Sequence, residues 1–151
     1  ASDPRMTNPS FAGIAPDGSV VTVNAESIRP QAGQDQSWII DMFRAVIAAP
    51  GGGQIEMTAA EGVLDGAAQT ITLTGLARLT TSTGYAMETR GLTVAVDSGQ
   101  MQTRGALEIR APFGALTAGG MVYGPGPAGT PQMVFNGGVR LLYLPDREGS
   151  D

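Results

Sequence analysis

Apolar and polar residues alternate along most of the chain, most clearly between residues 55 and 79. Apolar side chains occupy every second position in 55–57 and again in 70–79, where threonines separate them. A period of two residues is typical of a β-strand with one buried face. Asp and Gly at 65–66 favour a turn between the two runs. This stretch is therefore predicted to be a strand, a turn and a second strand, with a break in the first strand at 61–62.

The same alternation recurs in other segments, each bounded by Gly, Pro, Asp or Ser. Strands are expected at 20–25, 92–96, 106–110, 116–123 and 133–144. The first of these follows the turn residues Asp17 and Gly18, so residues 11–25 are expected to form a hairpin. Regularly spaced strands and turns favour an all-β fold.

Segment 37–49 is compatible with two structures. As a helix capped by Ser37, it would place on one face Trp38, Met42, Ala45 and Ala49. As a strand with a slip near Arg44, it would place on one face Trp38, Ile40, Met42 and Val46. We expect a strand, because the neighbouring segments have β patterns and a short helix gains little stability alone.

Short motifs return along the chain at similar intervals. Residues 87–91 and 116–120 resemble 57–62, and glycine precedes a strand-like run at Gly75, Gly105 and Gly137. These glycines are separated by 30 and 32 residues (105 − 75 and 137 − 105). A period of this size indicates stacked units, none of which buries its apolar face alone.

Composition supports one β-rich domain. The chain has 151 residues, 22 of them Gly, and only 15% are charged. This length is sufficient for a single core, and the composition suits strands joined by tight turns. We expect a flexible lead-in at 1–10, the β domain at 11–144 and a flexible tail at 145–151.

Charge and the missing residue types exclude several functions. The net charge is −5, and all nine basic residues are Arg, scattered singly, so a nucleic-acid partner is not expected. Without His or Cys, the sequence lacks the usual residues of catalytic triads and zinc sites. Its carboxylates lie in turns or on the polar faces of strands, and its Gly-rich segments lack a phosphate-binding signature. We expect no catalytic residues, no metal and no cofactor.

The apolar face of the predicted strands has two interpretations. It can form the closed core of a sandwich, or it can line a groove between two sheets, for which the seven Met residues are suited. The last predicted strand, 133–144, ends at Pro145 and is a candidate sheet edge. Such an edge can accept a strand from a partner.

Several motifs resemble the LptC family of periplasmic lipopolysaccharide-export proteins, in the form typical of alphaproteobacteria. The resemblance begins at Met6-Thr7-Asn8-Pro9-Ser10-Phe11-Ala12-Gly13 and 21–26, and continues in Thr58-Ala59-Ala60-Glu61-Gly62 and 84–85. It ends in Phe135-Asn136-Gly137-Gly138-Val139-Arg140-Leu141. Together the motifs span about Met6 to Leu144, and their order and spacing carry the resemblance.

This resemblance implies a twisted, partly open antiparallel β-jellyroll that is not an enzyme. It implies a periplasmic bridge that accepts lipopolysaccharide from an inner-membrane ABC transporter and passes it to an LptA-like jellyroll. It also implies attachment to the inner membrane through an N-terminal helix, which lies outside this sequence. Alternatives are an LptA-like soluble lipopolysaccharide-binding protein and a structural or adhesive β-repeat domain without a ligand.

Site residues follow from combining the apolar face with this resemblance. Acyl chains are expected to lie against Phe11, Val21, Ile55, Met57, Leu73, Met87, Val94 and Leu116. The downstream partner is expected at a C-terminal edge formed by Val139, Arg140, Leu141, Leu142, Tyr143 and Leu144.

Overall fold

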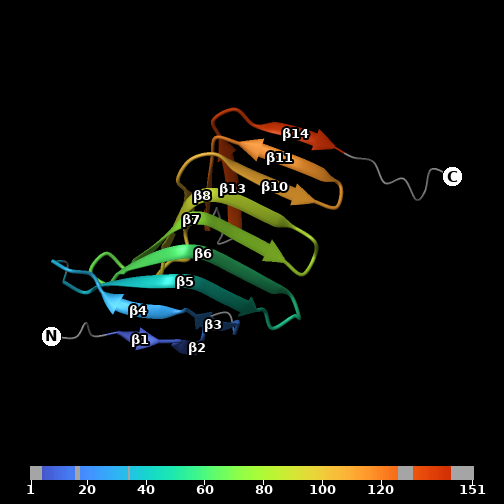
Figure 1. The fold of residues 1–151 in the computed structure, drawn as a ribbon. Helices are drawn as coiled ribbons and strands as arrows, with labels where there is room; N and C mark the ends of the chain where they lie inside the picture. Colours follow the sequence, from blue (N-terminus) through green and yellow to red (C-terminus); the bar gives the residue numbers. More distant parts are fainter. Residues whose placement is uncertain (1–4, 16–17, 34, 126–130, 144–151) are drawn as a thin grey trace.

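The computed structural model describes residues 5–15, 18–33, 35–125 and 131–143, which form an all-β fold. Over these residues fourteen strands join in one antiparallel sheet. Figure 1 shows them stacked largely in chain order, from β1 and β2 at one end to β14 at the other. The all-β, antiparallel jellyroll class predicted from the sequence is confirmed.

The strands on the N-terminal side are β1 (Met6–Thr7), β2 (Ser10–Ile14), β3 (Val20–Asn24), β4 (Ser27–Pro30), β5 (Ser37–Ala48), β6 (Gln54–Asp65) and β7 (Thr70–Thr81). Those on the C-terminal side are β8 (Ala86–Ala95), β9 (Met101–Thr103), β10 (Leu107–Ala111), β11 (Gly114–Ala118), β12 (Gly120–Pro125), β13 (Pro131–Asn136) and β14 (Arg140–Tyr143).

The long strands β5 to β8 fold this sheet into two layers. The first half of β5 pairs with β4 and its second half with β3, while β8 pairs first with β10 and then with β9. One layer, layer I, has the order β2-β3-β5-β6-β7-β8-β10-β11-β14. The other, layer II, has the order β1-β4-β5-β6-β7-β8-β9-β12-β13. The long strands are shared, and the core lies between the layers.

Passages of the chain from layer II to layer I have a common backbone feature. Each contains a residue with positive φ: Asn8 (53°), Met42 (57°), Gly75 (74°), Gly105 (110°) and Gly137 (73°). Positive φ is readily adopted by Gly and tolerated by Asn, because larger side chains clash with the backbone there. The glycines spaced by 30 and 32 residues therefore mark successive returns to layer I. The motifs at 57–62, 87–91 and 116–120 mark the passages in the opposite direction.

One prediction about the continuity of a strand was wrong. The break expected at 61–62 is absent, because β6 is continuous from Gln54 to Asp65. Gly62 is buried against Leu73, and an added Cβ would lie 3.2 Å from the Leu73 side chain. The register with β7 nevertheless shifts between Thr58 and Glu61 of β6, opposite the bulge that Gly75 and Leu76 form in β7.

Two predicted strands are each divided between the layers. The expected strand 133–144 is β13 in layer II and β14 in layer I, because Gly137 and Gly138 both have positive φ and redirect the chain. The expected strand 116–123 is likewise β11 and β12, interrupted at Gly119. An ordered strand also begins earlier than residue 11, since β1 lies within the expected lead-in and pairs with β4. The expected tail at 145–151 lies outside the described residues.

Segment 37–49 forms a strand, β5, as expected. Its predicted face was partly wrong, because positive φ at Met42 changes the alternation at that point. Met42 is 58% exposed on the outer surface, whereas Phe43 and Ala45 are buried between the layers.

The buried residues form two clusters, both with members from the two layers. The N-terminal cluster comprises Ile40, Phe43, Ala45, Ala59, Leu73, Ala77 and Leu92. The C-terminal cluster comprises Met87, Leu107, Ala118 and Met121. These clusters hold the two layers together.

Candidate functional site: an apolar path between the layers

The strand register aligns apolar side chains in rows that cross the whole sheet. The row on the inner face of layer I contains one residue from each strand: Phe11, Val23, Ala45, Met57, Leu79, Met87, Ile109, Leu116 and Leu141. A row in layer II contains Pro30, Trp38, Leu64, Ile71, Val94, Met101, Tyr123 and Met133. Directly paired residues point to the same face of a sheet. The layer I row is therefore an unbroken apolar line from the N-terminal edge to the C-terminal edge, and the layer II row runs from β4 to the C-terminal edge.

Exposure along the layer I row is high at its ends and low in its middle. Phe11 at one end is 48% exposed and Leu141 at the other is 59% exposed, whereas Ala45 and Met87 are buried. Large apolar side chains exposed in a continuous line commonly mark a contact surface. The path is thus accessible at both edges of the sheet.

A cavity of about 370 Å³ lies between the layers in the C-terminal half. Layer I contributes the lining residues Leu79, Thr81, Tyr85, Ala86, Met87, Ile109, Ala111, Phe113, Gly114, Ala115, Leu116 and Leu141. Layer II contributes Met101, Met121, Met133 and Phe135. Flexible Met side chains adapt readily to ligands of varied shape. The lining is suited to hydrocarbon.

The hydroxyl of Thr81, which lines this cavity, already has partners. Its Oγ1 accepts a hydrogen bond from the Tyr85 backbone N–H at 3.2 Å and lies 2.8 Å from Thr83 Oγ1. Because a satisfied hydroxyl has little need of a further partner, it does not call for a polar ligand group.

The predicted acyl-chain residues all lie in β-strands, but they do not converge on one cavity. Met87 and Leu116 line it. Leu73 is 1% exposed in the N-terminal cluster, with Met57 and Val94 packed against that cluster. Of the remaining three, Phe11 and Val21 lie near the N-terminal edge in β2 and β3, and Ile55 lies in the layer I half of β6.

The predicted set omits residues from the short strands of layer II. Met101 and Met121 line the cavity opposite Met87 and Leu116. Their alternation was visible in the sequence, but β9 and β12 are too short for periodicity alone to assign their partners. The turn residues Tyr85 and Phe113 were also omitted, and only their packing reveals them.

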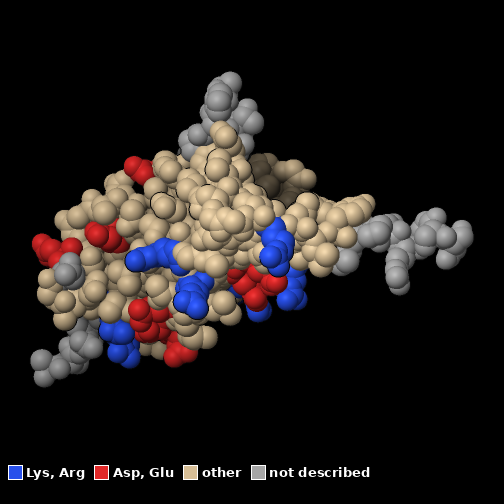
Figure 2. Space-filling model, turned by 90° about the horizontal axis from the view of Figure 1, so that it is seen from above, with Lys and Arg blue, Asp and Glu red and all other residues tan. Residues whose placement is uncertain are grey.

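Charged side chains lie on the outer faces. Cross-strand ion pairs join Arg44 to Glu56 and Arg78 to Glu88, and Arg29 lies 3.5 Å from Asp41. Figure 2 shows acidic and basic side chains interspersed over the face in view, with no large area of one sign. The polar outer surface contrasts with the apolar space between the layers.

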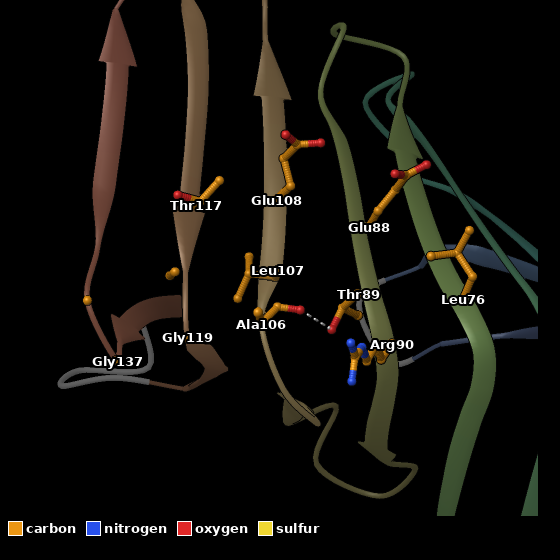
Figure 3. A pocket seen from close by; sticks show the side chains of 12 residues that line it. Leu76, Glu88, Thr89, Arg90, Ala106, Leu107, Glu108, Thr117, Gly119 and Gly137 are labelled. Atoms are coloured by element: carbon orange, nitrogen blue, oxygen red, sulfur yellow. Dashed lines mark hydrogen bonds between the residues drawn. The ribbon is translucent and has the colours of Figure 1, made fainter.

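A shallow depression also lies on the outer face, near the passage between layers. Glu88 and Glu108 are neighbours across β8 and β10 and point to the same side (Figure 3). Each forms an ion pair, with Arg78 and Arg110 respectively. The Thr89 hydroxyl donates a hydrogen bond to the Ala106 carbonyl at 3.0 Å, which joins β8 to the segment just before β10.

Among the described residues, no group of three or more acidic, His or Cys side chains could hold a metal ion.

Within the part of the chain that the structure describes, both layers end in strands that are paired on one side. Layer I ends at β2 and β14, and layer II ends at β1 and β13. The predicted edge residues from Arg140 to Tyr143 form β14, Val139 precedes it, and their side chains are exposed. Leu144 lies outside the described residues. An edge strand has free backbone groups that can pair with another strand.

These features define an open β-jellyroll with an apolar interior and, among the described residues, end strands that are paired on one side only. Residues 3–124 match the family described as lipopolysaccharide-assembly, LptC-related. The match covers most of the chain, and the chain belongs to this family, whose role is in lipopolysaccharide transport. No match was found among curated proteins. In the described part of the chain, no helix has the length and apolar character needed to cross a membrane.

Proposed function

We propose that this protein is a periplasmic bridge in lipopolysaccharide export. It accepts lipopolysaccharide from an inner-membrane ABC transporter and passes it to an LptA-like jellyroll. It is held at the inner membrane, and it carries the acyl chains of the lipid between its two layers. No catalytic step is required of it.

The observation that carries this proposal is the unbroken apolar row from Phe11 to Leu141. Transfer of hydrocarbon from water to an apolar surface is favourable by roughly 25 cal/mol per Å². A row that continues from strand to strand offers similar contacts along its length, so an acyl chain can advance without crossing a polar barrier. The exposed ends of the row lie where neighbouring proteins would dock.

Photo-crosslinking tests whether the lipid lies inside. Benzoylphenylalanine at Leu116 points between the layers, whereas the same residue at its neighbour Thr117 is exposed on the outer face. Lipopolysaccharide should be labelled strongly from position 116 and weakly from 117. A second matched pair is Met87 and Glu88 on β8. Equal labelling within both pairs would contradict transport between the layers.

We propose that the edges determine the direction of transfer. β14, with the flanking Val139 and Leu144, adds to a strand of the LptA-like partner, and the N-terminal edge at β1 and β2 faces the transporter. Leu142→Pro removes a backbone N–H from β14, whereas Leu142→Ala keeps it. Binding to the partner should fall in the Pro variant alone. Unchanged binding with an intact fold would remove β14 from the interface.

A further inference from the structure

A groove follows the outer side of the crease where the chain passes between the two layers. It consists of the depression that contains Glu88 and Glu108, of about 520 Å³, and a second depression of about 410 Å³. The two meet at Leu76, which lines both. Met42 of β5 lines the second depression, and Gly137, just before β14, lines the first. The groove therefore crosses the strands on the outer surface, away from the apolar path between the layers.

Small residues leave space in the C-terminal part of this groove. Figure 3 shows Leu76 and Arg90 on one side of this part, and Gly119 and Gly137 on the other. Four strand-to-strand steps separate β7 from β14 in layer I. At ~4.8 Å for each step they span about 19 Å, which is the length of about six residues of extended chain. The groove is thus long enough for a short peptide segment.

Two apolar side chains are exposed in the N-terminal part of the groove, although their backbone conformation is unfavourable. Met42 and Leu76 have φ of 57° and 69° and are 58% and 52% exposed. Positive φ is disfavoured for side chains larger than those of Gly, Asn or Asp. An exposed side chain gains little from burial that could offset this cost. These two residues are therefore suited to contact with a partner outside the chain.

The charge on the wall of the groove is not balanced within the chain. Glu88 is paired with Arg78, and Glu108 is paired with Arg110. Arg90 also lines the groove and is exposed, but among the described residues it has no carboxylate partner. The positive charge of Arg90 therefore remains available to an acidic ligand.

Two more exposed arginines extend this positive charge. The Arg104 backbone N–H donates a hydrogen bond to the Gly91 carbonyl at 2.8 Å, which places Arg104 beside the neighbour of Arg90. Arg140 is paired across the strands with Thr117, which lines the groove, so both side chains point to the outer face. Within the described part of the chain, neither arginine has an ion-pair partner. This region is therefore cationic, although the net charge of the whole chain is −5.

From this combination we propose that the groove binds an extended acidic segment of a partner protein. An apolar side chain of the segment packs against Met42 and Leu76, and its carboxylates pair with Arg90, Arg104 and Arg140. Guanidinium groups suit this role because they bind carboxylates through two parallel hydrogen bonds. The inference goes beyond the proposed function, since the groove is separate from the lipid path between the layers.

The shape and charge of the molecule favour a peptide over an anionic membrane as the partner. Arg90 lies within a concave groove, where a narrow chain can reach it more easily than a flat bilayer can. The chain as a whole is acidic, with a net charge of −5, so an anionic bilayer would repel most of its surface.

Fluorescence anisotropy with two fluorescein-labelled peptides tests the proposal in the whole chain. The acidic peptide is Leu-Thr-Glu-Thr-Glu-Thr-Glu, which places Leu and Glu on one side when extended. The control peptide has Gln in place of each Glu. The acidic peptide should bind more tightly at low salt, and added salt should remove the difference.

Substitution of single arginines locates the binding site of the acidic peptide. Arg90→Gln should weaken its binding about fivefold at low salt. Arg29→Gln is the matched control, because it removes the same charge from β4, outside the groove, and should leave the affinity nearly unchanged. Equal binding of the two peptides, or an unchanged affinity in Arg90→Gln, would overturn the proposal.

Leu76→Asn separates binding from stability. Asn tolerates positive φ better than Leu, so thermal melting should show an unchanged or higher Tm, while the affinity for the acidic peptide falls. A lower Tm with unchanged peptide binding would show that Leu76 serves the fold alone and would overturn the proposal. Circular dichroism checks that each variant folds.

Sedimentation with vesicles of phosphatidylethanolamine and phosphatidylglycerol tests the membrane as an alternative. The wild-type protein should remain in the supernatant. Sedimentation that Arg90→Gln abolishes, together with no binding of the acidic peptide, would overturn the proposal in favour of a membrane contact. Crosslinking of lipopolysaccharide from Leu116 tests the lipid path separately and is expected to be the same in Arg90→Gln.

Discussion

The N-terminal and C-terminal halves of this jellyroll use the same rows of apolar residues but pack them differently. Around Leu73, side chains from both layers meet in a cluster that is almost fully buried. Around Leu116, the layers enclose a cavity lined by Met and aromatic residues. The comparison indicates different roles for the two halves. The closed N-terminal half supplies stability, and the open C-terminal half supplies space for a ligand.

The largest expected effect comes from Leu73→Ala. Leu73 is fully buried between the layers, so its truncation should destabilise the fold by ~2–5 kcal/mol. Leu76→Ala is the matched control, since Leu76 lies on the same strand with its side chain exposed. Urea denaturation measures both. Similar losses of stability for the two variants would contradict the distinction between the buried interior and the exposed outer face.

Gly75→Ala should have the next largest effect, about 1–3 kcal/mol. Gly75 has φ of 74°, and an added Cβ would lie 2.7 Å from the Ala60 Cβ. Gly99→Ala is the control in the other half: its φ is 75°, but a Cβ there would meet nothing within 4 Å. Thermal unfolding should show a greater loss for Gly75→Ala, because only that variant adds a steric clash to the backbone strain.

How far the sequence predicts this structure depends on the scale of the feature. Alternation identified the strands, and the spaced glycines indicated a repeat of stacked units, because both depend on local backbone preferences. The division into layers was not predicted, since β8 is one continuous strand whose first half pairs with β10 and whose second half pairs with β9. The acyl-chain prediction included Met87 and Leu116 but spread over the closed half, because the cavity depends on packing between distant strands.

Leu116→Ala should cost less stability than Leu73→Ala, about 1 kcal/mol, because Leu116 is partly exposed and borders a cavity that already exists. The same change should reduce labelling of lipopolysaccharide from a crosslinker at Met87. Urea denaturation and crosslinking measure the two effects. A loss as large as that of Leu73→Ala would mean that the C-terminal half is closed in solution.

The smallest expected effect concerns the outer face. Arg78→Met removes the ion pair with Glu88, and because Arg78 is largely exposed the change should be below ~1 kcal/mol. Lipopolysaccharide crosslinking from Leu116 should remain unchanged. A large loss of labelling would indicate that the outer face takes part in lipid binding, against the contrast with the apolar interior.

Methyl NMR with labelled methionines tests the central claim most directly. Met87, Met101 and Met121 line the cavity, whereas Met42 is exposed on the outer face. On titration with lipopolysaccharide, we predict large chemical-shift changes for the three cavity methyl groups and almost none for Met42. Changes at Met42 as large as those at Met121, or unchanged cavity methyl groups at saturation, would contradict transport of lipid between the layers.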